Sequence, residues 1–194
     1  ATGGRFTIAN ALVAAELASA LGVVEDRVIE GLASAPPVPG RFEPVFLEGG
    51  PTLVVDYAHT PDALSGALAT AHEVAAGRVL VVFGCGGERD AGKRPEMGAV
   101  AETGADLVVV TSDNPRGEPP RGVIADILSG MDRAPALIEP DRRQAIAGAL
   151  ALAEVDDLIL VAGRGHEDVQ EAAGLLTPFD DRTVARQEWA RMSS

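Results

Sequence analysis

Apolar residues along this chain fall into two kinds of run, and their order predicts the architecture. Short continuous runs rich in β-branched residues are typical of strands buried on both faces, as in parallel sheets. Such runs predict strands at residues 52–56, 78–83, 107–111, 137–139 and 158–162. Helical spacing between them predicts helices at residues 61–76, 93–103, 122–131, 142–153 and 181–192. Strands that alternate with helices indicate right-handed crossovers, so we expect an α/β fold with a doubly wound, mostly parallel sheet.

The beginning of the chain has a different pattern. Residues 8–21 are apolar on most sides and predict a helix, and residues 28–33 predict a shorter one. The proline-rich segment Pro36–Gly40 follows and is typical of a stiff linker. Because the part before it holds no predicted strand and is too short to form a domain alone, we place a domain boundary there. We expect residues 1–37 to be the end of another domain and residues 38–194 to form the main one.

Composition narrows the classes of function. The net charge of −13 disfavours nucleic-acid binding, which needs a basic face. No apolar run approaches the ~20 residues of a membrane span, and the first residues do not resemble a signal peptide. We therefore expect neither nucleic acid nor membrane as a partner. The single cysteine, Cys85, allows no internal disulfide and fits a reducing cytoplasm. We expect it to be a small buried core residue rather than a nucleophile.

The most informative loop follows the predicted strand at residues 107–111. It reads Asp113-Asn114-Pro115-Arg116, and open α/β sheets bind their ligands at the carboxyl ends of strands. Asp113 can hold an ammonium group and Arg116 can bind a carboxylate through two parallel hydrogen bonds. Together they suit the free end of an amino acid. Local chemistry alone leaves a second interpretation open, since Asp, Asn and Pro are also common in turns.

A second loop, at residues 84–94, is rich in glycine and lies between a predicted strand and a predicted helix. Gly87 to Lys93 matches the first part of a P-loop, but Arg94 stands where a magnesium-binding Ser or Thr is required. We therefore reject a P-loop. One interpretation is a cradle for a carboxylate or phosphate, with Arg89 as its cation. The other is a glycine turn with solvated charges.

Two further loops carry polar groups at strand ends. In the first, Asp56 can accept hydrogen bonds from a ribose and His59 can contact a base or phosphate. The alternative is a helix cap by Thr60, with His59 as a packing residue. In the second, Gly163 lets a ligand approach the backbone and Glu167 can hold an ammonium group. In this loop the side chains of His166, Glu167 and Asp168 are adjacent in sequence and therefore point apart, so we predict no metal site.

These loops converge on one edge if the sheet is doubly wound. Arg89, Arg116, Asp113, Asn114 and Glu167 would then face one cleft. Two guanidinium groups with two acids match a ligand that has two carboxylates and two amines.

Taken together, the loop motifs resemble the Mur ligases of peptidoglycan synthesis, and within them the ligases that add meso-diaminopimelate. The resemblance rests on GRFE from Gly40, DYAHTPDAL from Asp56, GCGGERDAGKRP from Gly84, DNPR from Asp113, GRGHED from Gly163 and FDDR from Phe179. It implies a C-terminal, Rossmann-like amino-acid-binding domain, preceded by a short helical remnant of the central ATPase domain.

The resemblance also implies individual roles. The residues expected to contact diaminopimelate are Arg89, Asp113, Asn114, Pro115, Arg116, Gly163 and Glu167. Those expected to contact a nucleotide are Asn10, Arg41, Asp56, Tyr57 and His59. The distal carboxylate of diaminopimelate, which lysine lacks, would meet Arg116.

The activity that the resemblance implies is ATP-dependent amide formation in the cytoplasm. Diaminopimelate would join the UDP-MurNAc-dipeptide through an acyl phosphate, with ATP and Mg²⁺ used by the whole ligase. This sequence has no Gly-Lys-Thr P-loop, no site for the family's carbamylated lysine and no UDP-binding domain. We therefore expect a fragment that binds no cofactor and does not turn over alone. The alternative is an isolated amino-acid-binding module without catalysis.

Overall fold

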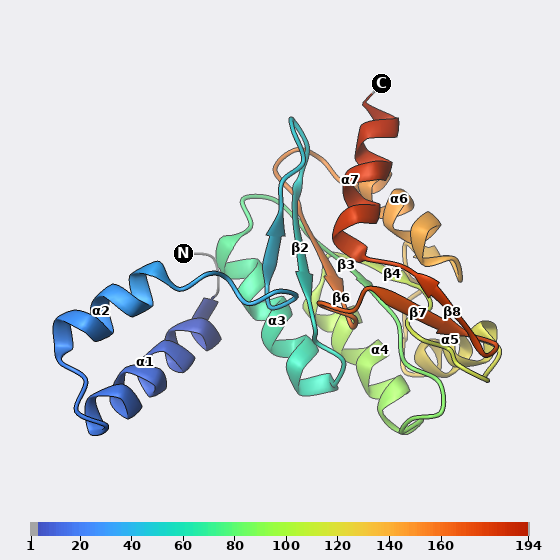
Figure 1. Ribbon diagram of the computed structural model, residues 1–194. Helices are drawn as coiled ribbons and strands as arrows, with labels where there is room; N and C mark the ends of the chain where they lie inside the picture. The colour runs from blue at the N-terminus through green and yellow to red at the C-terminus, as the bar shows by residue number, and fades with distance from the viewer. Residues whose placement is uncertain (1–3, 194) are drawn as a thin grey trace.

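The computed structural model describes residues 4–193 and shows helices on both faces of a central sheet (Figure 1). The sheet has six strands in the order β1-β2-β6-β3-β4-β5. They are β1 (Glu43–Val45), β2 (Thr52–Asp56), β3 (Val79–Phe83), β4 (Leu107–Val110), β5 (Leu137–Ile138) and β6 (Leu158–Ala162). All neighbours are parallel except β1, which pairs antiparallel with β2. The predicted doubly wound, mostly parallel α/β fold is confirmed.

Two apolar layers enclose the sheet. On one face, α3 (Pro61–Val74), α4 (Lys93–Gly104) and α5 (Pro120–Leu128) cover a core that includes Phe83 and Leu160. On the other, α6 (Arg142–Leu152) and α7 (Asp181–Met192) pack over alternate residues of the same strands. All five residues of β3 are buried, as are all five of β6. Continuous apolar runs predicted these strands because both of their faces are covered.

Local capping fixes where two of these helices begin. The Thr60 hydroxyl accepts a hydrogen bond from the Ala63 N–H at 3.3 Å, and Pro61 occupies the first turn of α3. The Asp141 carboxylate accepts from the backbone of Arg143 and caps α6. The Thr60 cap is one of the two interpretations that the sequence left open for this loop.

The strand order reverses beside β6, which lies between β2 and β3. The chain runs outward from β3 through β4 to β5. The connection through α6 then brings it back to the middle of the sheet, where β6 pairs between β2 and β3. Because β2, β6, β3 and β4 are parallel, the loops that follow them leave from one edge. This reversal is where open α/β sheets form a ligand crevice.

Two features were not predicted. The first is the edge strand β1, which has three residues, one of them Pro44. The second is a hairpin of β7 (Val169–Ala172) and β8 (Leu175–Pro178), which forms a separate two-stranded sheet. No residue of the hairpin is buried, so its apolar positions form no core pattern.

Two helices precede the sheet. They are α1 (Gly4–Ala20) and α2 (Glu25–Ser34), which lie beside each other and to one side of the sheet (Figure 1). α1 starts before the predicted residue 8 and contacts α3, while α2 buries no residue. The domain boundary after residue 37 stays a prediction. Within residues 4–193, no helix is both long and apolar enough to cross a membrane.

Candidate functional site

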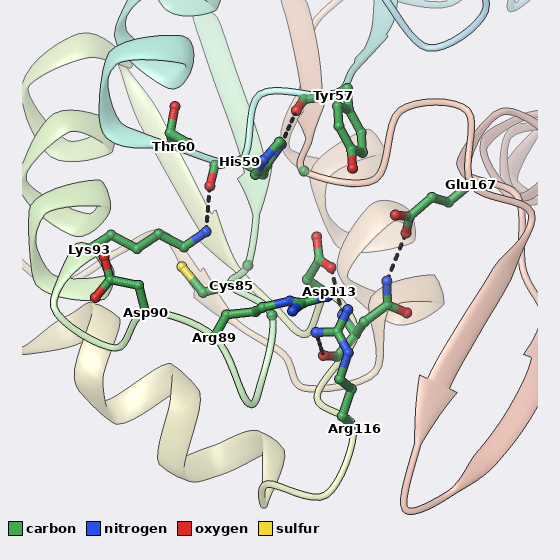
Figure 2. Close-up of a pocket in the computed structure, with 14 residues that line it drawn as sticks. Tyr57, His59, Thr60, Cys85, Arg89, Asp90, Lys93, Asp113, Arg116 and Glu167 are labelled. Carbon is green, nitrogen blue, oxygen red and sulfur yellow. Dashed lines mark hydrogen bonds between the residues drawn. The ribbon is translucent and has the colours of Figure 1, made fainter.

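A cavity of about 530 Å³ opens at the carboxyl edge of the sheet, and all four of the loops singled out in the sequence line it (Figure 2). The residues that line it are Tyr57, His59, Thr60, Gly84, Cys85, Gly86, Arg89, Asp90, Lys93, Asp113, Asn114, Arg116, Gly163 and Glu167. The expected convergence of Arg89, Arg116, Asp113, Asn114 and Glu167 on one hollow is therefore present.

Arg89 and Arg116 reach into this cavity from neighbouring loops (Figure 2). Arg116 Nη1 donates to the carbonyl of Gly87 at 2.8 Å, and its Nε lies 3.4 Å from a carboxylate oxygen of Glu171. Its backbone is left-handed, with φ of 51°. Among residues 4–193, Arg89 has no hydrogen bond or ion pair to its guanidinium. One cation is thus fixed by the protein, and the other is available to a ligand.

Asp113 supplies a buried carboxylate beside these cations. Its Oδ1 accepts a hydrogen bond from the N–H of Asn114 at 2.7 Å. Burial raises the pKa of Asp113, and the positive charges of Arg142 and Arg164 oppose that rise. A ligand ammonium group would supply further positive charge and favour the ionised form.

Gly163 allows β6 to end directly against Asp113. A Cβ at Gly163 would lie 2.4 Å from Asp113 Oδ2, and its φ of +115° also disfavours any other residue. The close neighbour that this glycine admits is the side chain of Asp113, and the predicted approach of a ligand to Gly163 stays a prediction.

Asn114 connects three parts of the site. Its Oδ1 accepts hydrogen bonds from Arg164 Nη1 at 2.8 Å and from the N–H of Glu171 at 2.9 Å. Its Nδ2 donates to Glu167 Oε2 at 2.7 Å (Figure 2). Pro115 is buried and does not line the cavity; its carbonyl accepts from the N–H of Glu118 at 3.0 Å.

The Gly-rich loop contributes the side chain of Arg89 to the cavity, whereas two of its backbone N–H groups are used within the protein. The N–H of Gly87 donates to the carbonyl of Asn114, and the N–H of Glu88 donates to Glu118. These two donors are therefore not free to bind an anion. Arg94, which replaces the P-loop hydroxyl residue, is buried and pairs with Glu118 and Asp126 at 2.8 Å each.

Two of the candidate nucleotide-binding residues lie at the rim of the cavity. Tyr57 and His59 line it, and their rings make an edge-on contact with centroids 4.5 Å apart. The Arg41 guanidinium lies 4.9 Å from the centroid of the Tyr57 ring. These three side chains form an aromatic and cationic surface next to the amino-acid cavity.

The other two candidates are placed differently. Asp56 accepts hydrogen bonds from the N–H of Phe42 at 2.7 Å and the N–H of Ala58 at 2.8 Å, one on each carboxylate oxygen. Burial raises the pKa of Asp56. Asn10 is exposed on α1, and neither residue lines the cavity.

The cavity also includes residues that were not selected as site residues. Lys93 Nζ donates to the carbonyl of His59 at 2.7 Å, which joins the Gly-rich loop to the loop after β2. Asp90 lies on the same loop. The glycine-rich and charged composition of this loop is the sequence feature that could have identified both residues as site residues. Cys85 is 2% exposed, as expected of a core residue, and burial raises its pKa to about 12. Residues 4–193 hold no group of three or more His, Cys, Asp or Glu side chains arranged for a metal ion.

Curated relatives align along most of the chain. A UDP-N-acetylmuramoyl-L-alanyl-D-glutamate–2,6-diaminopimelate ligase of Chromobacterium violaceum is 50% identical over 186 residues, covering 95% of this chain and 38% of that protein. The ligase of the same name from Acidovorax sp. is 52% identical over 192 residues, covering 97% and 38%. The chain thus spans well under half the length of these relatives.

Solved structures agree with the fold and extend the family evidence. A structure of a ligase of that same name has a TM-score of 0.77 and 37% identity, and it covers 98% of this chain and 39% of its own. The UDP-N-acetylmuramate-alanine ligase of Thermotoga maritima has a TM-score of 0.65 and 25% identity, covering 98% and 38%. The family model for the Mur ligase, glutamate ligase domain, matches residues 40–165. This match includes more than half of the sequence, and the chain belongs to the Mur ligase family.

Proposed function

We propose that this chain forms the amino-acid site of an ATP-dependent ligase that adds meso-diaminopimelate to the UDP-MurNAc-dipeptide. One observation supports this most directly. Two guanidinium groups, of Arg89 and Arg116, share a cavity with two carboxylates, of Asp113 and Glu167. That set is complementary to a molecule with two carboxylates and two amines. The named relatives are ligases for 2,6-diaminopimelate.

Each end of the ligand has its own set of partners in this proposal. The carboxylate at the reacting end pairs with Arg89, the cation that has no protein partner among the described residues. The distal carboxylate pairs with Arg116, and the distal ammonium group lies between Asp113 and Glu167. Pro115 shapes the turn that carries these groups. This assigns no carboxylate partner to the amine at the reacting end, which acts as a nucleophile in its neutral form; Asp90, which also lines the cavity, accepts a hydrogen bond from the N–H of Gly92.

The reaction that follows is amide formation on an acyl phosphate. The free amine attacks the activated γ-carbonyl of D-glutamate, and the new C–N bond forms as the bond from that carbon to the phosphate oxygen breaks. The proton that the nitrogen loses leaves with phosphate or water. Residues of this chain contribute position and complementary charge rather than proton transfer. We place the reaction in the cytoplasm.

The rim beside the cavity suits a nucleotide. Tyr57 and His59 offer ring faces and Arg41 offers a cation, which are the groups that base and phosphate recognition uses. A related FolC protein of E. coli, 25% identical, was solved in complex with ADP. In the whole ligase, ATP with Mg²⁺ would lie along this rim. Asp56 would act indirectly there, by holding the backbone of Phe42 and Ala58.

The test is titration calorimetry of the chain with meso-diaminopimelate and with L-lysine. We expect a preference for diaminopimelate that Arg116→Ala abolishes, since the loss of a charge-assisted contact costs about 2 kcal/mol, or roughly 30-fold in affinity. Arg133→Ala is the matched control, because Arg133 is exposed and pairs with Glu102 away from the cavity. Equal affinity of the unaltered chain for both amino acids would refute the assignment.

An amino-acid-binding module without catalysis is the second candidate. It is favoured by the absence of a P-loop from this sequence and by the coverage of 38% of the relatives. A phosphate-release assay with ATP, meso-diaminopimelate and the UDP-MurNAc-dipeptide separates the two. We expect no turnover by these 194 residues alone. Measured turnover would show that the chain is catalytically sufficient.

A further inference from the structure

The side-chain amide of Asn114 has a defined orientation, and two donors impose it. Arg164 Nη1 and the backbone N–H of Glu171 both donate to one end of the amide, at 2.8 Å and 2.9 Å. Neither donor can accept a hydrogen bond. The end they contact must therefore be the oxygen, and the amide nitrogen must point the other way, to Glu167 Oε2 at 2.7 Å.

Arg164 is itself held rigidly. Its side chain is 0% exposed, and its Nη2 donates to the carbonyls of Val169 at 2.9 Å and Phe179 at 3.0 Å. The guanidinium carbon also lies 5.4 Å from the centroid of the Phe179 ring. These contacts leave the guanidinium one geometry, in which Nη1 faces Asn114. Full burial of an arginine is rare, and here both terminal nitrogens have hydrogen-bond partners while the buried Nε has none among residues 4–193.

Glu167 is the side chain that this arrangement orients. Its Oε2 accepts from Asn114 and lies 3.9 Å from Arg164 Nη1, while its Oε1 has no hydrogen bond with residues 4–193. The Glu167 side chain is 34% exposed and lines the cavity (Figure 2). One oxygen is thus fixed by the protein, and the other is available to a ligand.

We propose that Arg164 is a positioning residue for amino-acid binding, which acts through Asn114 to aim the free oxygen of Glu167 at the ligand ammonium group. The proposal rests on the proposed function, because it assumes that an amino acid occupies the cavity. Arg164 does not line the cavity and would not touch the ligand. Its effect on affinity should therefore pass mainly through the Glu167 carboxylate, with a smaller part through Asp113, whose ionised form the charge of Arg164 also favours.

A double-mutant cycle tests this dependence. Arg164→Met, Glu167→Gln and the double variant are titrated with meso-diaminopimelate by calorimetry. We expect each single change to weaken binding about tenfold, and the double variant to bind within about twofold of Glu167→Gln alone. Arg164→Lys should recover part of the affinity, since it keeps a cationic donor for Asn114. Arg182→Met is the matched control, because this partly buried arginine pairs with Asp180 and Glu43, outside the cavity.

A nuclear magnetic resonance measurement reads the amide directly. In the unaltered chain, the two side-chain N–H signals of Asn114 should be well separated and protected from exchange with water. Arg164→Met should bring them toward free-amide values, and Arg182→Met should leave them unchanged. If Arg164→Met does not fold, Arg164→Lys is used in both measurements, with smaller changes of the same sign.

The outcomes separate the two hypotheses. Additive losses in the cycle, or unchanged Asn114 signals in the Arg164 variant, would overturn the positioning role. If the unaltered chain binds neither meso-diaminopimelate nor L-lysine, the proposed function fails. In that case, the Asn114 signals of Arg164→Met still test the positioning role. Unchanged signals would refute it, and altered signals would support the part of it in which Arg164 orients Glu167 through Asn114.

Discussion

At the scale of single residues, Asp113 shows a conflict between stability and binding. The fold buries its carboxylate, and burial raises its pKa above the ordinary value of 3.8. Arg142 and Arg164 supply positive charge nearby, and Glu167 adds a negative charge that opposes them. A raised pKa means that the folded state favours the protonated acid. Stability is therefore lost as the pH rises through the folded-state pKa of Asp113.

Asp113→Asn removes this ionisation while keeping an oxygen for the N–H of Asn114. We expect the variant to gain stability relative to the unaltered chain as the pH rises from about 3 to about 7. Its affinity for meso-diaminopimelate should fall about tenfold, because a charged acceptor for the ammonium group is lost. Urea unfolding at both pH values and calorimetry at neutral pH measure the two effects. A variant less stable at neutral pH would show that the carboxylate stabilises the fold.

The sequence predicted site residues whose positions follow from the strand order alone. It did not predict residues whose role depends on side-chain or backbone contacts with distant parts of the chain. Arg89 and Arg116 follow neighbouring strands, so a doubly wound sheet brings them to one edge. Arg164 gave no such signal, because a charged residue in a loop is normally exposed and this one is fully buried. The internal use of the Gly87 N–H was equally invisible, since it depends on the facing carbonyl of Asn114.

At the scale of elements, a charge cluster around the buried Arg94 connects α4 to the loop before α5. Arg94, on α4, is 3% exposed in its side chain and donates to both carboxylate oxygens of Glu118, at 2.8 Å and 2.9 Å. Glu118 also accepts from the N–H of Glu88, next to Arg89. The cluster therefore determines where the loop that carries Arg89 lies relative to the loop that carries Arg116.

Hydrogen bonds from Arg94 lower the pKa of Glu118 from 4.5 to about 2. A lowered pKa gives a stability contribution that is present above pH 4.5 and lost as the pH falls through about 2. We expect Glu118→Gln to lower the melting temperature at neutral pH, with a difference that shrinks below pH 4.5. Thermal unfolding followed by circular dichroism across this range measures it.

The same substitution should also weaken binding of meso-diaminopimelate. The glutamine keeps one oxygen for the N–H of Glu88 but loses the charge and the second oxygen that bind Arg94, which loosens the loop that presents Arg89. Glu102→Gln is the control, because Glu102 also has a lowered pKa but binds Arg133 away from the cavity. Equal affinities of the two variants would show that the cluster has no part in placing Arg89.

Sequence patterns recovered the strands that bury two faces and missed the two strands, β7 and β8, that bury none. β3 and β6 are entirely buried, and their uninterrupted apolar runs predicted them. β7 and β8 form a hairpin whose residues are all at least partly exposed, and its stability depends on contacts with a distant loop. Among these, the N–H of Arg116 donates to the carbonyl of Glu171 at 3.0 Å, a pairing without any local sequence signal.

At the scale of the whole molecule, a buried ion pair fixes two of the loops that line the cavity relative to each other. Arg142 and Asp181 are both 0% exposed, with Nε and Oδ1 2.8 Å apart. Arg142 also donates to the carbonyls of Ser112 at 3.2 Å and Ala162 at 3.0 Å. These carbonyls directly precede Asp113 and Gly163. The ends of β4 and β6 are thereby fixed relative to each other before any ligand binds.

A ligand that contacts all of these loops should stabilise the chain as a unit. At a concentration 100 times its dissociation constant, meso-diaminopimelate should add about 2.7 kcal/mol to the free energy of unfolding, or about 5–10 °C in melting temperature. L-lysine at the same concentration should add less, and Arg116→Ala should bring the two shifts together. A thermal scan with each amino acid measures this.

Leu150→Ala separates ligand linkage from general stability. Leu150 is 2% exposed in the core beneath α6, so its truncation should cost about 3 kcal/mol without touching the cavity. Because the loops around the ligand are unchanged, the shift that meso-diaminopimelate causes in this variant should equal that in the unaltered chain. A shift that disappears with Leu150→Ala would mean that the amino acid stabilises the chain from somewhere other than this cavity. A preference for meso-diaminopimelate over L-lysine that Leu150→Ala keeps and Arg116→Ala removes locates the bound amino acid among the four loops.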